Sequence, residues 1–238
     1  TANLEALWVA RQCDAKTIVL ANEHAHYTHS RMSEVLGMPF QAIPSTEKGS
    51  MNCSKLEAVL AQLRSNEVKA TIVVTLGTTG MGAVDPLEEI VPLARAYGAR
   101  IHVDAAYGGY FTLADLSKDV QCHFTAMTEA DSIVIDPHKH GLQPYGCGAV
   151  LFKNPEEGRF YKHDSPYTYF TSDQLHLGEI TLECSRAGAA AARRCYHRRR
   201  LFASDVSRRA RLERNASFEH PRRLSWGRWC WRLLRASR

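Results

Sequence analysis

The sequence predicts an α/β fold in which helices cover both faces of a mostly parallel central sheet. Short runs of apolar and β-branched residues recur along the chain, and segments with helical spacing of apolar residues stand between them. This alternation is typical of β–α–β units, because a helix must carry the chain back before the next parallel strand can begin. The expected strands are residues 17–20, 71–76, 100–103, 132–135 and 147–152.

The helices between these strands have recognisable ends. We expect them at residues 3–12, 29–36, 54–63 and 86–98. Ser54 and Glu57 have the spacing of a capping box, so they are expected to cap the third helix. Asp85 is expected to cap the fourth helix, with Pro86 in its first turn and Gly98 at its end.

Polar residues follow three of the expected strands. The run Gly-Thr-Thr-Gly at 77–80 follows one strand, Asp104 follows the next, and Lys139 comes shortly after residues 132–135. In open parallel sheets, ligands bind beyond the carboxyl ends of the strands. These residues are therefore expected to meet at one edge of the sheet and to form a site there.

The composition is that of a globular protein. The chain has 238 residues, enough for one large domain or two small ones, and 45% of them are apolar. We find no run of 18 apolar residues and no signal-peptide pattern, so neither a transmembrane helix nor secretion is expected. The seven cysteines are scattered and form no CxxC pair, which favours reduced thiols in a cytoplasmic protein over a disulfide framework.

Positive charge is concentrated at the C-terminal end. The net charge of the chain is +5, yet residues 193–238 alone hold 15 arginines, no lysine and 3 acidic residues. A basic tail with interleaved aromatic residues can bind nucleic acid. A shifted reading frame in a GC-rich gene would produce the same composition, and we favour it because natural basic arms usually mix lysine with arginine. We expect this tail not to fold, and we expect no nucleic-acid partner.

Lys139 is the most informative single residue. It lies in the run Asp-Pro-His-Lys-His-Gly at 136–141, shortly after an apolar strand. Burial of an ammonium group is costly, and it lowers the pKa of lysine toward the neutral, nucleophilic amine. One use of such an amine is a Schiff base with an aldehyde cofactor. The alternative is an ordinary surface lysine in a loop.

Two runs together resemble a known family. His-Val-Asp-Ala-Ala-Tyr-Gly-Gly at 102–109 and the run at 136–141 resemble the pyridoxal-phosphate-dependent amino-acid decarboxylases of the group that includes glutamate, aromatic-amino-acid and tyrosine decarboxylases. The resemblance covers residues 1–192. It implies a partial large domain of the fold type I pyridoxal-phosphate enzymes, followed by a separate tail at 193–238. The family's phosphate-binding cup and C-terminal domain are missing, so we expect a fragment.

The resemblance implies a function and the residues that carry it. The function is decarboxylation of an amino acid to its amine, with pyridoxal 5'-phosphate as cofactor, in an enzyme that is a homodimer when complete. Lys139 would hold the cofactor through its amine. Asp104 would bond to the ring nitrogen and keep it protonated, so that the ring can draw electrons from the substrate. His26 would stack on the face of the ring.

Three further residues are assigned by the same resemblance. Thr79 would place a hydroxyl group near the cofactor, and Ala106 would allow the ring to lie close to the backbone. His138 would face the phosphate or the substrate carboxylate. Arg186 fits either a ligand-binding role or a structural ion pair.

Other interpretations remain open. One is another lyase of the same fold, such as the sphingosine-phosphate-lyase type, although the proline at position 137 favours the decarboxylases. Another is an inactive remnant whose basic tail binds nucleic acid. His24, His26 and His29 are clustered, but no cysteine or carboxylate completes a standard zinc set, so no metal is expected. Glutamate, aspartate and aromatic amino acids all remain candidate substrates.

Overall fold

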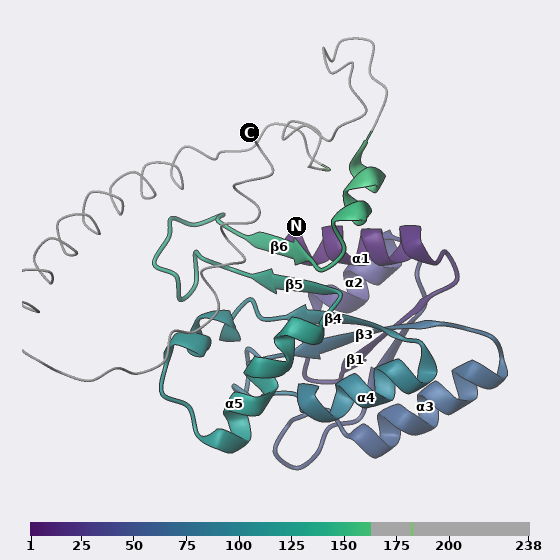
Figure 1. The fold of residues 1–238 in the computed structure, drawn as a ribbon, viewed down its shortest axis with the longest axis horizontal. Coiled ribbons are helices and arrows are strands. Elements are labelled where there is room, and N and C mark those ends of the chain that lie inside the picture. The colour runs from purple at the N-terminus through teal and green to yellow at the C-terminus, as the bar shows by residue number, and fades with distance from the viewer. Residues whose placement is uncertain (163–181, 183–238) are drawn as a thin grey trace, which may run out of the picture. The chain divides into compact units, whose positions relative to one another are not determined.

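The computed structural model describes residues 1–162 and residue 182, and the predictions for Arg186 and for residues 193–238 lie outside them. A six-stranded sheet forms the centre of the described part (Figure 1). Its strands are β1 (Ile18–Asn22), β2 (Phe40–Ile43), β3 (Ala70–Thr75), β4 (Arg100–Asp104), β5 (Ser132–Ile135) and β6 (Ala149–Phe152). The α-helices are α1 (Ala2–Cys13), α2 (Thr28–Val35), α3 (Cys53–Ser65), α4 (Leu87–Tyr97) and α5 (Lys118–Thr125).

The sheet has the order β2-β1-β3-β4-β5-β6. The first five strands are parallel, and β6 pairs with β5 in the antiparallel sense. The predicted mostly parallel sheet is therefore confirmed. Because the five strands share one direction, their carboxyl ends meet at one edge, on the left in Figure 1, where the loop between β5 and β6 also extends.

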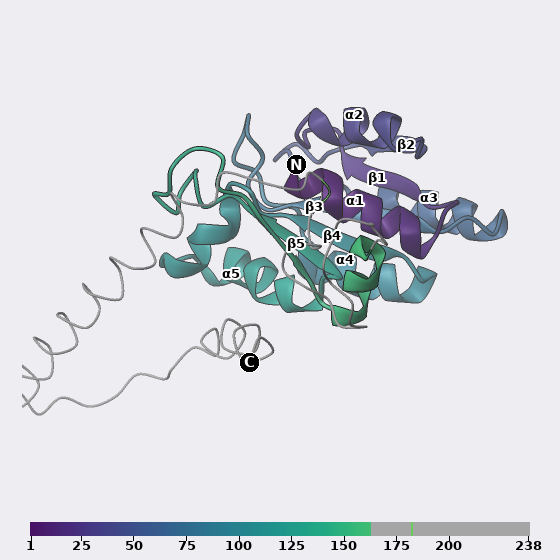
Figure 2. The same cartoon turned by 90° about the horizontal axis from the view of Figure 1, so that it is seen from above.

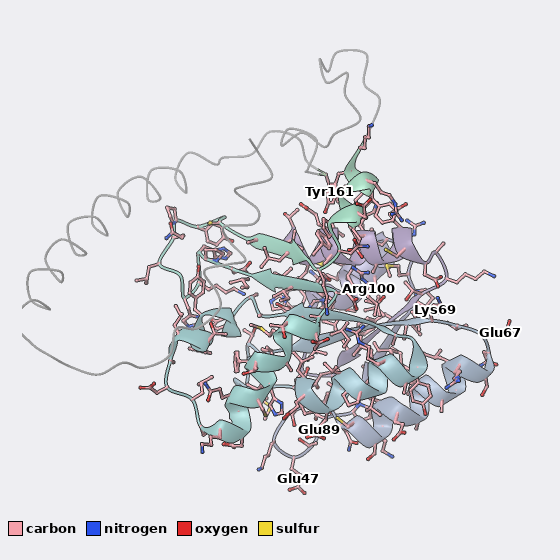
Figure 3. The ribbon with its side chains drawn as sticks, viewed as in Figure 1. Glu47, Glu67, Lys69, Glu89, Arg100 and Tyr161 are labelled. Carbon is pink, nitrogen blue, oxygen red and sulfur yellow. The ribbon has the colours of Figure 1, made fainter. Side chains whose placement is uncertain are left out.

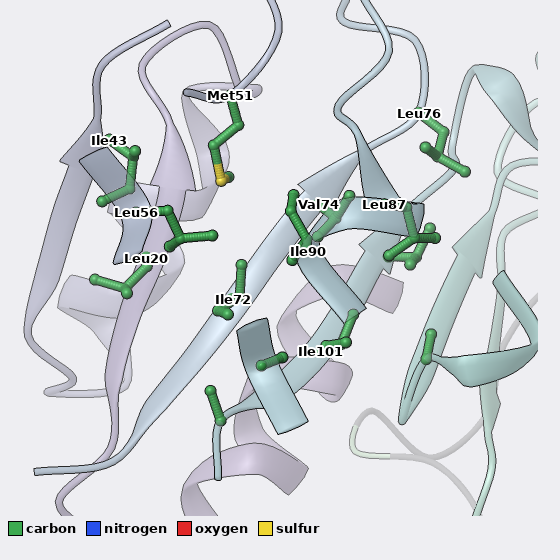
Figure 4. Close-up of a cluster of buried hydrophobic side chains, with 14 of the residues drawn as sticks. Leu20, Ile43, Met51, Leu56, Ile72, Val74, Leu76, Leu87, Ile90 and Ile101 are labelled. Carbon is green, nitrogen blue, oxygen red and sulfur yellow. The ribbon is translucent and has the colours of Figure 1, made fainter. Parts of the chain in front are cut away.

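Alternate residues of each buried strand pack against helices on opposite faces of the sheet. Val19, Ala21 and Val73 pack in a cluster with Leu7 of α1. The intervening strand residues join a larger cluster with residues of α3, α4 and α5, and Figure 4 shows its central side chains. Figure 2 shows α1 and α2 on one face of the sheet and α4 and α5 on the other. The predicted helix cover on both faces is confirmed.

The predicted helix caps are partly wrong. Asn52, rather than Ser54, caps α3, because its side chain accepts a hydrogen bond from the backbone N–H of Lys55. The residue before α4 is Pro86, which makes no side-chain cap. Gly98 does end α4, with a φ of 64° that glycine adopts without strain.

Asp85 is buried and links neighbouring strands through hydrogen bonds instead of capping a helix. Its Oδ1 accepts hydrogen bonds from the Asn22 side chain and the Met51 backbone N–H, each at 2.7 Å. Its Oδ2 accepts from the backbone N–H of Thr75 at 2.8 Å. Asp85 is fully buried, so its carboxyl group joins the end of β1, the end of β3 and the loop before α3.

An ion pair lies at the amino-terminal ends of the strands. Arg100 and Lys69 lie at this end of the sheet (Figure 3). The guanidinium of Arg100 donates to both carboxylate oxygens of Glu157, at 2.8 and 2.7 Å. This bidentate pair fastens the 3-10 segment Pro155–Tyr161 to β4. Among the described residues, no helix is both long and apolar enough to cross a membrane.

Candidate active site

A cavity of about 190 Å³ opens at the carboxyl edge of the sheet. Its lining includes five of the six site residues that the sequence predicts, namely His26, Thr79, Asp104, Ala106 and Lys139. These residues follow β1, β3, β4 and β5, so four separate strands bring them together. Asp104 and Lys139 therefore face one cavity, as the interpretation of the sequence requires.

Asp104 ends β4 and is almost completely buried. Its Oδ2 lies 2.8 Å from Nε2 of His29 and accepts a hydrogen bond from the Asn3 side chain at 3.2 Å. Its Oδ1 accepts from the backbone N–H of Ala106 at 3.1 Å. Burial alone would raise the pKa of this carboxyl group, but the hydrogen bond from His29 and the electrostatic interaction with His29 lower it by more. The net pKa lies well below the usual range, so Asp104 is a buried anion.

His29 is the site residue that the sequence interpretation missed, because it was considered only as a possible metal ligand in the cluster with His24 and His26. It is fully buried beneath the cavity. The signal for this position is its helical spacing with Met32, Ser33 and Leu36, which turn one face of α2 toward the sheet. Within residues 1–162, the three side chains whose possible ligand atoms lie within 4.8 Å of one another are instead Glu88, Cys122 and His123.

Lys139 is positioned by a turn after β5. Its backbone N–H donates to the carbonyl of Asp136, and its Nζ lies 3.3 Å from Oδ2 of the same residue. The Nζ also lies 4.7 Å from the ring centroid of Tyr107, close enough for a cation–π contact. The side chain is 27% exposed, so this amine is reachable from the cavity and less buried than the sequence suggests.

His26 lies in the loop between β1 and α2. Its Nδ1 lies 2.8 Å from the hydroxyl oxygen of Thr28 and 3.4 Å from the backbone nitrogen of the same residue. Burial lowers the pKa of His26. Nearby charged groups act more weakly on this pKa, and some of them raise it while others lower it. The ring stacks on Tyr27, with the two centroids 4.5 Å apart, and the residue lines the cavity.

The other three predicted residues differ in their surroundings. Thr79 is exposed at the rim of the cavity, and Ala106 is buried in its wall. His138 does not line the cavity: its Nδ1 lies 2.7 Å from the carbonyl oxygen of Cys147, and its Nε2 is 3.8 Å from Asp136.

Comparison with known proteins agrees with this geometry. The family model described as "Pyridoxal-dependent decarboxylase conserved domain" matches residues 4–202. The chain belongs to this family. The match confirms the resemblance that the motifs at 102–109 and 136–141 indicate, and pyridoxal phosphate is the cofactor of the family. It also extends past residue 192, and the predicted division of the chain there stays a prediction.

Curated relatives are decarboxylases of several amino acids. L-2,4-diaminobutyrate decarboxylase of Acinetobacter baumannii is 34% identical over 162 residues, which are 66% of this chain and 31% of that protein. Aspartate 1-decarboxylase of Aliivibrio fischeri is 32% identical over 219 residues, covering 79% of this chain and 39% of that one. L-tyrosine decarboxylase of Enterococcus faecium is 30% identical and covers 73% and 35%. The chain thus spans about a third of the length of these relatives.

Solved structures show the same fold. The crystal structure of mouse CSAD matches with a TM-score of 0.67 and 23% identity, over 78% of this chain and 42% of that one. The glutamate decarboxylase domain of a Vibrio parahaemolyticus protein, named as a diaminobutyrate-pyruvate transaminase and L-2,4-diaminobutyrate decarboxylase, matches with a TM-score of 0.59 and 26% identity. It covers 67% of this chain and 39% of that one. The predicted fold type I large domain is confirmed.

Proposed function

We propose that the protein decarboxylates an amino acid to carbon dioxide and the corresponding amine, with pyridoxal phosphate as its cofactor. The main support is that an amine, a carboxylate and an imidazole line one cavity at the carboxyl edge of the sheet, on Lys139, Asp104 and His26. The names of the curated relatives support a decarboxylase over a lyase of the sphingosine-phosphate type.

The described residues fit this cofactor in their chemistry. Asp104 is a buried anion next to the cavity, and a carboxylate has about four lone-pair positions, of which three are used by His29, Asn3 and Ala106. One acceptor position is left for a ring N–H. Lys139 offers the primary amine that an aldehyde requires, and the cavity separates it from Asp104.

Each residue then has a definite task. Bound pyridoxal phosphate supplies the electron sink for the pair of electrons left when the substrate carboxylate departs. Asp104 would keep a proton on the ring nitrogen of this cofactor, the amine of Lys139 would bind its aldehyde group, and His26 would cover one face of the ring. Ala106 leaves room for the ring beside the backbone, and Thr79 supplies a hydroxyl group at the rim.

His138 has a different kind of role in this proposal. It does not line the cavity, and its Nδ1 lies on the carbonyl oxygen of Cys147. We infer that it reaches the phosphate or the substrate carboxylate only when the loop between β5 and β6 moves. Leu142 and Tyr145 of this loop are exposed.

Activity toward amino acids tests the proposal directly. The purified chain, supplied with pyridoxal phosphate, is expected to release amine and carbon dioxide from one or more of 2,4-diaminobutyrate, aspartate, glutamate and tyrosine. The matched control is Lys139→Ala, which removes the amine and is expected to abolish release. Release of neither product from any amino acid, with cofactor bound, would overturn the assignment as a decarboxylase.

We also propose a homodimer in the cytoplasm. Large apolar side chains are exposed on the loops beside the cavity, at Tyr107, Leu113, Leu142 and Tyr145, and a second subunit would cover them. The cavity is smaller than the about 300 Å³ at which ligand pockets usually begin, which fits a site completed by a partner. Light scattering is expected to give twice the mass of the chain, and a monomer at high concentration would contradict this.

The four cysteines of the described residues are free thiols, which supports a location in the cytoplasm.

A further inference from the structure

The carboxylate of Asp104 is reached by a chain of hydrogen bonds that runs through α1, β4 and β5. The Asn3 side-chain N–H donates to Oδ2 of Asp104, so the Asn3 carbonyl oxygen must act as an acceptor. That oxygen lies 2.9 Å from Nε2 of His102. On its other side, Nδ1 of His102 lies 2.9 Å from the hydroxyl oxygen of Ser132.

The direction of this chain is determined by chemistry. Burial lowers the pKa of His102 to about 3, so its ring is neutral and carries one proton. Because the Asn3 oxygen can only accept, that proton lies on Nε2, and Nδ1 must accept from the Ser132 hydroxyl. Every donor therefore points along the chain toward Asp104, and the chain ends at the carboxylate.

His29 reaches the same carboxylate oxygen from α2, which lies on the same face of the sheet as α1. Its Nε2 is 2.8 Å from Oδ2 of Asp104, and its side chain is fully buried. Its Nδ1 has no hydrogen-bond partner among the described residues. A buried imidazole with one unpaired nitrogen is costly, and the cost is offset only by the bond that Nε2–H donates to the anion.

We propose that His29 is a positioning residue, which keeps Asp104 ionised and holds its remaining acceptor position toward the cavity. The inference rests on the proposed function, because the group that uses this position is the ring N–H of pyridoxal phosphate. His29 itself does not line the cavity, so it acts through Asp104 alone. The Ser132–His102–Asn3 chain supports the same oxygen but is neutral throughout, so His29 is the group with the strongest effect on the charge of Asp104.

The other titratable groups near Asp104 are the same in any His29 variant. His102 lies beside it on β4, and His26, Asp136 and Lys139 lie across the cavity. A substitution at position 29 therefore measures how much the imidazole contributes to the pKa of Asp104, because the other titratable groups stay in place.

The first test needs no cofactor. In protein labelled with 13C at aspartate carboxyl groups, the Asp104 signal is assigned by its loss in Asp104→Asn. In the wild type this signal is expected to stay that of an ionised carboxylate at every pH at which the protein is folded. In His29→Leu, which fills the same space without a donor, the Asp104 pKa is expected to rise by about one unit or more.

Two variants make this result specific. His29→Gln keeps an N–H donor at a similar distance but cannot carry a charge, so it is expected to bring the pKa of Asp104 part of the way back from its value in His29→Leu. His24→Leu removes an exposed histidine from the same loop region and is expected to leave the pKa of Asp104 unchanged. An unaltered Asp104 titration in His29→Leu would overturn the proposal, as would failure of His29→Gln to differ from His29→Leu.

The second test uses pyridoxal phosphate labelled with 15N in its ring. The ring nitrogen is expected to be protonated in the wild type at neutral pH and to lose proton occupancy in His29→Leu, with partial recovery in His29→Gln. Equal protonation in all three proteins would overturn the inference while leaving the proposed function intact. Failure of the wild type to bind the cofactor would overturn the proposed function, whereas the carboxyl titration would still decide the effect of His29 on Asp104.

Discussion

Asp85 and Asp104 are both buried, yet their surroundings move their pKa values in opposite directions. Burial raises the pKa of Asp85 to about 6, because its three hydrogen-bond donors are all neutral amide groups and offset burial only in part. Asp104 has an imidazole donor at 2.8 Å, which lowers its pKa below the usual range in spite of burial. The neighbouring imidazole thus makes the carboxylate of Asp104 suited to bind a cationic ring, whereas Asp85, whose donors are all amides, has a structural role.

Gly108 tests how tightly the loop after β4 is packed. A Cβ atom at this position would lie 1.9 Å from the backbone carbonyl oxygen of Leu76, which cannot move aside as a side chain can. Gly108→Ala is therefore expected to lower the free energy of unfolding by about 1–3 kcal/mol, measured by urea denaturation. In the control, Gly80→Ala, the new Cβ meets no atom within 4 Å, and a change within about 0.5 kcal/mol is expected. Equal effects of the two changes would contradict the close approach of these loops.

At the scale of elements, the buried parallel strands were predictable and the irregular ones were not. β5 has the predicted bounds, and β3 and β4 differ by one residue at their ends, because their runs are continuous and apolar. β2 was not predicted: it is a short edge strand with two exposed residues, and it has no apolar run to mark it. α5 was also missed, since only Phe124 of its residues is fully buried.

Asp85 shows why local motifs misled the prediction of caps. An aspartate before a proline and a helix is typical of an N-cap, but here tertiary contacts use its carboxyl group instead. Asp85→Ala leaves three buried donors without an acceptor and is expected to lower the free energy of unfolding by about 3 kcal/mol or more. Glu57→Ala is the control, because Glu57 is exposed and makes no cap, and a change within about 0.5 kcal/mol is expected.

The same variant has a pH signature. The folded-state pKa of Asp85, about 6, lies above its ordinary value of 3.8, so the native state binds the proton more tightly than the unfolded state. The contribution of this group to stability is therefore greatest at low pH and falls as pH rises through about 4 to 6. Urea denaturation is expected to show a wider gap between wild type and Asp85→Ala at pH 5 than at pH 7. A gap that grows with rising pH would contradict burial as the dominant cause.

At the scale of the whole molecule, the place of the site was predictable but its supporting network was not. Asp104 and Lys139 could be placed together because parallel strands share one carboxyl edge. The contacts of His29 and Asn3 with Asp104 depend on how α1 and α2 pack over β4, and no spacing within the sequence encodes that packing. His138 shows the converse, since proximity to Lys139 in the sequence does not bring it to the cavity.

The site requires that the amine of one particular lysine holds the cofactor, and this can be measured directly. The chain is incubated with pyridoxal phosphate, treated with borohydride to fix the cofactor to the amine that holds it, digested and examined by mass spectrometry. The account predicts the adduct on the peptide that contains Lys139, and its loss in Lys139→Ala. An adduct confined to other lysines, or none at all, would contradict the assignment of this cavity.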